Sequence, residues 1–532
     1  MRRLGLTLAI GIFLFSVGTL VRPEEQPAEA ISRVALPAEL RKIINENRRI
    51  ARPPPNPDIM DMIAGFTPHF DAEEDARVAE ILRHRRRIRN WRHSTNLQGI
   101  GGTDNLNIYL THEQAGEEIQ FLFDLLRNGY GGYQYFGGDS VFIPIRNALL
   151  EQLANMDNPL QVSSYINDLI LPALQGVIAD NHFWIHDVSF GAPAYVPYMS
   201  GEFILRKSEG GFVTEIDGVM YSVLEVTQNA QSVSGILPTL SPEGEFAWAF
   251  GLVTMEDQQD DIEISVVFEN AATGETHSRM VNLPKIIAAP PRPSYPMVVT
   301  REMDGITILE SRSFNVRSGN DRIDFLQSGS ALRDRPVLII DLNGNSGGRA
   351  TYPYEWIRLY TGHEPAVFML FFRPRSQVSV ELQDYFIPYQ VSARFRERRA
   401  ISTIEEPSCV IGFPMQMATI PNENLVIVLI DNNVASAGEL FVGHLRQLDN
   451  VLFVGTNTKG ALIAGNIGRT SLPHSGLRIT FGTGLSMRLD LSQFEGVGFM
   501  PDLWVPPGES LERVLRFIER YGLANGAFGT VD

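Results

Sequence analysis

A strand that ends in paired glycines is the first feature of this sequence that suggests a reaction. The apolar run Val337–Asp341 predicts a buried strand, and it leads directly into the glycine-rich segment 342–348. Gly347 and Gly348 permit a tight turn and leave backbone amides facing outward. Such amides can stabilise the negative charge that develops on a carbonyl oxygen during acyl transfer. An ordinary strand-to-helix turn uses the same residue types, so the motif alone leaves both interpretations open.

Ser436 is the second feature, because its neighbours predict that it lies where a helix begins. The apolar strand Leu425–Ile430 precedes it, and an amphipathic stretch follows. A serine in this place can cap the helix, with Glu439 three residues on completing a capping box. The same place suits a nucleophile, since the free amide of Ala437 can stabilise the oxyanion that its attack creates.

Four sequence motifs occur in a fixed order along the second half of the chain. They are the segments 341–348, 435–439, 454–458 and 495–502. Together with a helical region that ends in Asp180-Asn181-His182, this series resembles the S41 peptidases, the family of the tail-specific (C-terminal-processing) and tricorn-core proteases. The resemblance extends over roughly residues 110–519.

The resemblance implies a fold and a site. The fold is α/β, with a crotonase-like catalytic domain. The nucleophile is Ser436, and the oxyanion hole is formed by Gly347, Gly348 and the amide of Ala437. Peptidases of this type need no cofactor and no metal, so none is expected. Asn343 stands where the family commonly has arginine, so the salt bridge that supports the glycine turn is expected to be missing.

The resemblance also offers two general bases, since a serine hydroxyl needs a neighbour to remove its proton as it attacks. Tail-specific proteases use a lysine some distance beyond the serine, which Lys459 resembles, although it comes early in its motif. The tricorn-like branch uses a histidine, matched by His182, with a carboxylate that matches Glu495. Imidazole titrates near neutral pH and needs no strong desolvation. We therefore favour His182, oriented by Glu495, and keep Lys459 as the alternative base.

Simpler interpretations of these residues stay open. His182 lies beside Phe183 and Trp184 and could be a polar residue with satisfied hydrogen bonds, while Glu495 could make a structural hydrogen bond in a loop. His186 is a weaker competitor for the role of base.

The elements that must hold these residues form four parts. They are an N-terminal extension (31–109), a helical N-terminal domain (110–192), a small β-rich domain (193–288) and the α/β catalytic domain (297–525). Apolar residues at helical spacing predict the second part, and short β-rich runs divided by Gly, Asn and Asp predict the third. The β-rich domain occupies the place of the family's PDZ module, which makes it PDZ-like by position, although it lacks a convincing loop for binding a free C-terminus. A proline-rich linker, 289–296, leads to the catalytic domain.

Residues 1–30 have the pattern of a secretory signal peptide. They contain Arg2 and Arg3, an apolar run over 4–21 and a small-residue cleavage site at 28–30. A secreted, periplasmic or otherwise extracytoplasmic location is therefore expected. Because the apolar run approaches the length that spans a bilayer, an uncleaved signal that tethers the protein to a membrane is the alternative.

The amino-acid composition limits the kinds of molecule that this protein is expected to bind. The net charge of -17 argues against nucleic acid, which is bound mainly through surplus lysine and arginine. The single cysteine, Cys409, excludes an internal disulfide framework. We expect an exported serine endopeptidase that cleaves proteins or peptides through an acyl-enzyme on Ser436. The alternative is a non-catalytic S41-like scaffold that binds peptides or other ligands, and the sequence does not indicate an oligomeric state.

Overall fold

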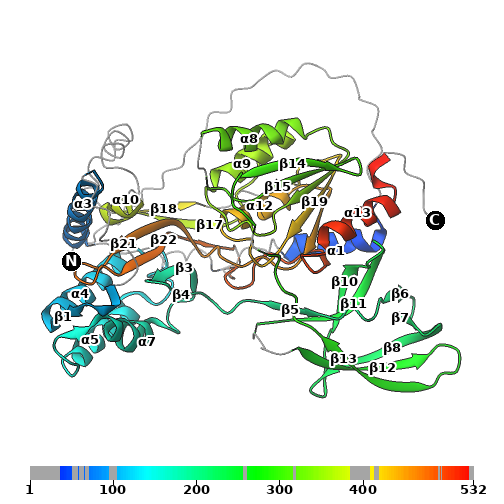
Figure 1. Cartoon of the computed structure of the whole chain (residues 1–532), viewed down its shortest axis with the longest axis horizontal. Helices are drawn as coiled ribbons and strands as arrows, with labels where there is room; N and C mark the ends of the chain where they lie inside the picture. The colour runs from blue at the N-terminus through cyan, green and yellow to red at the C-terminus, as the bar shows by residue number, and fades with distance from the viewer. Residues whose placement is uncertain are drawn as a thin grey trace, which may run out of the picture.

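The computed structural model describes most of the chain in separate segments. They are residues 36–50, 71–94, 105–255, 261–290, 292–315, 319–383, 408–412, 419–488 and 494–525, with the single positions 58, 65, 490 and 492. The expected signal peptide, 1–30, lies outside them. Of the helices in these segments, none is long and apolar enough to cross a membrane. Figure 1 shows an α/β body, a helical body and a β-rich body.

A six-stranded sheet forms the centre of the α/β body. Its strand order is β14 (Val298–Met303), β15 (Ile306–Ser311), β16 (Val337–Asp341), β19 (Leu425–Ile430), β20 (Val451–Gly455) and β23 (Leu503–Trp504). β14 runs antiparallel to β15, and every other neighbouring pair is parallel. The carboxyl ends of β16, β19 and β20 therefore meet at one edge of the sheet, where ligand sites form in folds of this kind.

Both faces of this sheet are covered, which explains why its strands are apolar throughout. One face carries α8 (Gly319–Ala331), α9 (Thr351–Thr361) and α12 (Ala437–Leu445). The other face carries α1 (Ala38–Ile50) and α13 (Ser510–Arg520). Successive residues alternate between the two cores, so that Ile340 packs with the first set of helices and Ile339 with the second. The predicted mixed α/β class is confirmed, and the layering is consistent with a crotonase-like domain.

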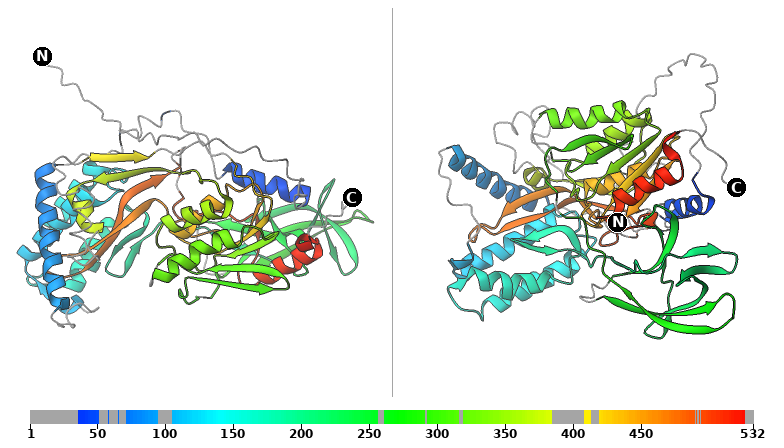
Figure 2. Two further views of the ribbon diagram at one scale, coloured as in Figure 1. Left: turned by 90° about the horizontal axis from the view of Figure 1, so that it is seen from above. Right: turned by 45° about the vertical axis from the view of Figure 1, so that its right-hand side comes forward.

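A second sheet joins the α/β body to the helical body. Its order is β18 (Ser408–Gly412), β17 (Leu370–Arg375), β22 (Arg478–Met487), β3 (Asp180–Ile185) and β4 (Val188–Phe190), and β21 (Ala464–Ser471) pairs with β22. In Figure 2 the β21–β22 hairpin, drawn in orange, reaches from the α/β body to the helices drawn in cyan. The sequence placed Asp180–His182 at the end of a helical region, whereas these residues begin a strand that pairs with the hairpin. The pairing of β3 with β22, far along the chain, is what makes these residues a strand and not the end of a helix.

The helical body is built around α4 (His112–Gly129) and α5 (Gly138–Leu153). Thr111 caps α4 through a capping box with Gln114. The apolar face of α4 is buried against the β21–β22 hairpin and β3, and Ile119, Phe183 and Phe481 belong to one common core. The helical body thus packs against β3 and supports it from one side.

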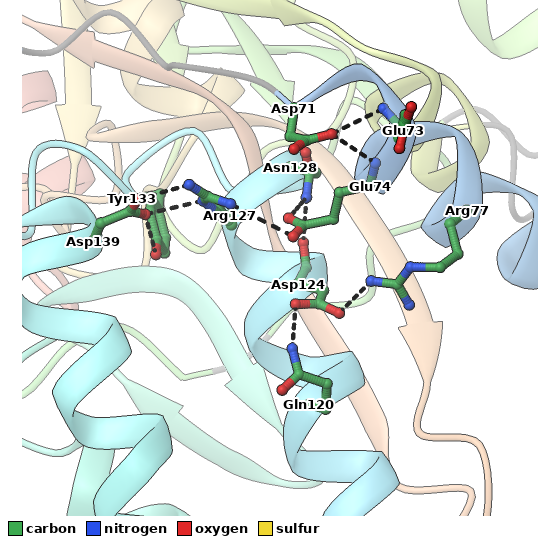
Figure 3. Close-up of polar contacts among 10 residues, drawn as sticks. All are labelled: Asp71, Glu73, Glu74, Arg77, Gln120, Asp124, Arg127, Asn128, Tyr133 and Asp139. Carbon is green, nitrogen blue, oxygen red and sulfur yellow. Dashed lines mark hydrogen bonds and ion pairs between the residues drawn. The ribbon is translucent and has the colours of Figure 1, made fainter.

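The N-terminal extension is part of the folded molecule. Its first helix, α1, adds Leu36, Leu40 and Ile44 to the core of the α/β body. Its second, α3 (Ala72–Ser94), lies along α4, where Arg77 pairs with Asp124 at 2.6 Å (Figure 3). Both helices are held by contacts to parts of the chain that follow much later.

The β-rich body contains two antiparallel sheets. One consists of β10 (Ile236–Leu240), β11 (Phe246–Thr254) and β5 (Val196–Met199); the other has the order β13 (Thr276–Leu283), β12 (Ile262–Asn270), β8 (Val219–Gln228), β7 (Gly211–Ile216) and β6 (Arg206–Ser208). The described residues between 193 and 288 contain strands and no helix. After β13, the linker runs back to the α/β body and into β14.

Candidate active site

The glycine turn and the Ser436 loop lie side by side because β16 and β19 are neighbouring parallel strands. The amide of Ala435 donates to the carbonyl of Asn345 at 3.0 Å. The amide of Gly344 donates to Asp431 Oδ1, also at 3.0 Å. Asp431 is the first residue after β19, so its buried carboxylate links the two loops. Sequence reasoning missed this link, which depends on strand order.

Gly347 lies against the nucleophile loop. It has φ +96°, and a Cβ atom at this position would lie 2.7 Å from the Ala435 carbonyl oxygen and 2.9 Å from Ser436 Cβ. Any side chain would push the two loops apart, so the close approach requires glycine. Ser436 itself has φ 54°, a conformation that costs about 1–3 kcal/mol and is kept only where the surroundings impose it.

The amides predicted for the oxyanion hole differ in their availability. The Gly347 amide donates to Asn345 Oδ1 at 2.9 Å, so it already has an acceptor in this structure. Asn345 forms a local turn of the kind that asparagine favours two residues before glycine, a signal that the sequence did contain. Within the segments described, no hydrogen bond is seen from the amides of Gly348 and Ala437. The amides of Gly348 and Ala437 are therefore available to donate to an oxyanion. Gly347 instead allows the glycine turn to lie close to the Ser436 loop.

Glu439 ties a third loop to Ser436. Its fully buried carboxylate accepts a hydrogen bond from the Ser436 amide at 3.0 Å. It also accepts bonds of 2.7 Å from the Thr458 hydroxyl and from the amides of Gly460 and Ala461. Burial raises the pKa of Glu439, and these bonds oppose that rise. The expected capping contact thus exists at the Ser436 amide, but the same carboxylate also fixes the loop after β20.

His182 and Lys459, the two candidate bases, lie close together beside this loop. Asn181 Nδ2 donates to the Gly460 carbonyl at 2.8 Å, and the Lys459 amide donates to the Val434 carbonyl at 2.9 Å. Burial and then the positive charge of Lys459 lower the pKa of His182 to about 4. The His182 imidazole is thus neutral at pH 7 and able to accept a proton. His182, Lys459 and Ser436 are each partly exposed, whereas most of the surrounding loop is buried.

Glu495 acts on the backbone next to His182. Its Oε1 accepts from the Asn181 amide at 2.6 Å, and its Oε2 accepts from the amides of Leu462 and Ile463 at 3.0 and 2.9 Å. Burial and the negative charge of Asp180 raise the pKa of Glu495. No hydrogen bond joins Glu495 to the His182 ring in the described part of the chain. The proposed orienter therefore holds the start of β3 in place.

Asp180 is the carboxylate near the His182 ring, and sequence reasoning gave it no role. His182 Nδ1 lies 4.0 Å from Asp180 Oδ1 and is buried without a hydrogen-bond partner. Asp180 Oδ1 accepts from the His182 amide at 2.7 Å, and Oδ2 accepts from the Tyr130 hydroxyl at 2.9 Å. The spacing Asp-x-His could have suggested this contact once 180–182 was read as a strand.

His186, the weaker competitor, is directed elsewhere. It has φ 56°, and its Nε2 lies 3.5 Å from Asp187 Oδ2. The described residues contain no group of three or more His, Cys, Asp or Glu side chains that could hold a metal ion.

Comparison with known proteins gives one family match. Residues 305–505 match the model of peptidase family S41. A search of curated proteins gives no significant match. The range 305–505 contains Ser436, Lys459, Glu495 and the glycine turn, while His182 lies before it.

Solved structures with remote likeness include three proteases. Mature CPAF is 15% identical, with 77% of this chain and 95% of that chain covered and a TM-score of 0.35. The photosystem II D1 C-terminal processing protease is 14% identical, covering 76% and 96%, with a TM-score of 0.34. The tricorn protease is 12% identical, covering 78% and 37%, with a TM-score of 0.32. The similarity of residues 305–505 to peptidase family S41 is therefore what indicates a serine-type peptidase domain in this chain.

Proposed function

We propose that this peptidase is an exported endopeptidase that cleaves proteins or peptides through an acyl-enzyme on Ser436. The observation that carries the proposal is the position of Ser436. It occupies a strained turn between the Gly347–Gly348 turn and the start of α12, where the Gly348 and Ala437 amides are available to bind an oxyanion. Two candidate bases lie at the same loop.

In the proposed mechanism, the Ser436 hydroxyl oxygen attacks the carbonyl carbon of the scissile peptide bond. His182 accepts the hydroxyl proton, and the amides of Gly348 and Ala437 stabilise the negative oxygen. His182 then returns the proton to the leaving amine as the peptide C–N bond breaks, which leaves an acyl-enzyme. Water, deprotonated by the same imidazole, hydrolyses the ester and restores Ser436.

His182 is favoured as the base because the contacts of Asp180 and Glu495 fix its backbone and because its Nδ1 lies 4.0 Å from Asp180 Oδ1. Lys459 is the alternative, since its amide donates to the carbonyl of Val434, two residues before Ser436, at 2.9 Å.

The test is labelling with a fluorophosphonate probe, followed by mass spectrometry of the labelled peptide. Wild type is compared with Ser436→Ala, His182→Ala and Lys459→Ala, and with Ser140→Ala, which alters an exposed serine in the first turn of α5. We expect labelling at Ser436, lost in Ser436→Ala and His182→Ala and retained in Lys459→Ala and Ser140→Ala. Loss in Lys459→Ala with retention in His182→Ala would transfer the role of base to Lys459. Absence of labelling in folded wild type would contradict the catalytic proposal.

Export is tested separately by sequencing the N-terminus of the protein secreted by its native cell. A mature N-terminus near residue 31 is expected from the cleavage site at 28–30. An intact N-terminus in a membrane fraction would indicate the tethered form instead.

A further inference from the structure

The glycine turn has a cationic partner that its own sequence lacks. Asn343 stands in the turn, and the supporting salt bridge was expected to be missing. The structure instead places Arg292, from the proline-rich linker, with Nη1 at 2.5 Å from Asp341 Oδ2. The Asp341 carboxylate is completely buried, whereas about a third of the Arg292 side chain (33%) is exposed. The cation thus reaches the base of the turn from outside the α/β body.

Asp341 passes this contact on to the turn. Its Oδ1 accepts a hydrogen bond from the Asn343 amide at 3.1 Å, so one carboxylate joins Arg292 to the first residues after β16. Burial raises the pKa of Asp341, and the charge and hydrogen bond of Arg292 oppose that rise. Without Arg292, the buried carboxylate would have to take up a proton or move toward water, because an unpaired charge in this environment is costly.

The same linker also holds the nucleophile loop. The Ala289 amide donates to Asp431 Oδ2 at 3.3 Å, while Asp431 Oδ1 accepts from the amides of Gly344 and Asn433 at 3.0 and 3.1 Å. Two buried carboxylates, one at the end of β16 and one just after β19, therefore connect the linker to both loops that form the site.

We propose that Arg292 is a positioning residue of the reaction. It acts through Asp341 to hold the turn 342–348, and with it the Gly348 amide, at the distance from Ser436 that oxyanion binding requires. The inference rests on the proposed function, because it assumes that Ser436 attacks a carbonyl whose oxygen these amides receive. Among the described residues, the side-chain contact of Arg292 is with Asp341 and not with Ser436.

Displacement of oxyanion donors lowers the rate of the chemical step more than it lowers binding. Removing one donor outright typically costs about 100- to 1,000-fold in rate, so a shifted turn is expected to cost roughly 10- to 100-fold. The probe is the fluorophosphonate, whose attack by Ser436 also places a negative oxygen in this site. We expect the maximal rate constant of labelling, kinact, to fall by this factor in Arg292→Ala. The probe concentration at half of that rate, KI, should stay nearly unchanged.

The matched control is Arg77→Ala. Arg77 lies on α3 with 53% of its side chain exposed and pairs with the buried Asp124 of α4 at 2.6 Å. This pair resembles Arg292–Asp341 in joining a partly exposed arginine to a buried carboxylate, but it lies in the helical body. Arg77→Ala is expected to label at the wild-type rate.

Two further measurements distinguish positioning from a purely structural role of Arg292: the labelling rate of a double variant, and the recovery of labelling on addition of guanidinium ion. If Arg292 acts through Asp341, the double variant Arg292→Ala/Asp341→Asn will label no more slowly than the slower of the two single variants. Added guanidinium ion is expected to restore part of kinact in Arg292→Ala and to leave wild type unchanged. Arg292→Lys, which keeps a cation but loses the planar donor group, serves if the alanine variant does not fold, with an intermediate kinact expected.

Wild-type kinact in Arg292→Ala or Arg292→Lys, or multiplicative effects in the double variant without rescue, would overturn the inference and leave the proposed function intact. Failure of the proposed function shows differently, because folded wild type would then not be labelled, or labelling would persist in Ser436→Ala.

Discussion

At the scale of single residues, the site depends on conformations and charges that only its surroundings make possible. Ser436 and Gly347 both have positive φ, and each is held against the other's loop. His182 is kept neutral by burial and by Lys459. The sequence around Ser436 made it a candidate, and the resemblance to the S41 peptidases added His182, Lys459 and Glu495. Neither identified which atoms these residues contact, because those contacts depend on loops from distant strands.

The neutral state of His182 predicts a pH effect on stability. The pKa of His182 is lowered from 6.5 to about 4 on folding, so its contribution is fully present above pH 6.5 and is lost as the pH falls toward 4. Wild type is expected to lose up to about 3 kcal/mol of unfolding free energy over this range through His182 alone. His182→Gln should remove that part of the slope, measured by denaturant unfolding at several pH values. His363→Gln, at an exposed position, is the control and should keep the wild-type slope.

Gly347→Ala is expected to abolish fluorophosphonate labelling. The new methyl group would meet backbone atoms of Ala435 and Ala437 at 2.7 and 2.9 Å, so the loops must separate. Gly344→Ala is the matched control in the same turn, because its φ of +79° carries a similar backbone cost of about 1 kcal/mol and nothing lies within 4 Å of the added atom. Equal labelling of the two variants would show that the close approach at Gly347 is not needed.

At the scale of elements, the strand order of the central sheet assembles the site. β16, β19 and β20 are neighbours, so the turns that follow them meet although more than a hundred residues separate the first from the last. Apolar runs predicted β16 and β19 correctly, because a strand buried on both faces leaves a clear signal. The conversion of 180–182 from an expected helical end to strand β3 was not predictable in this way, since its partner β22 lies far along the chain.

Glu439→Gln tests how elements are joined. The amide group that replaces the carboxylate can accept bonds on one atom only and would present N–H groups to the Ser436 or Ala461 amide. Leaving buried donors unsatisfied costs about 1–3 kcal/mol each, so the unfolding free energy should fall by about 3 kcal/mol and labelling of Ser436 should slow. Glu512→Gln, on the exposed face of α13, should change stability by less than about 0.5 kcal/mol. A Glu439→Gln variant as stable as wild type would rule out this role.

At the scale of the whole molecule, the parts are less separate than the sequence suggested. The stretch 31–109 was read as an extension, yet α1 completes the core of the α/β body, and Asn47 donates to Asp502 at 2.9 Å. Residues 193–288 were read as a β-rich domain, and strands do fill their described part. The linker after them was read as a spacer, yet Ala289 and Arg292 contact both loops of the site. The sequence showed where one part of the chain ends and the next begins. The contacts between those parts could be identified only from the folded structure.

The pairing of β3 with β22 has a consequence for the order of events during synthesis. A ribosome makes His182 long before Ser436, but β22 and Glu495, which hold the start of β3 in place, are made after Ser436. A growing chain that has reached residue 440 therefore carries a nucleophile and an imidazole that nothing yet brings together. In the proposed mechanism, hydrolysis can therefore begin only after β22 and Glu495 have been made and have folded against β3.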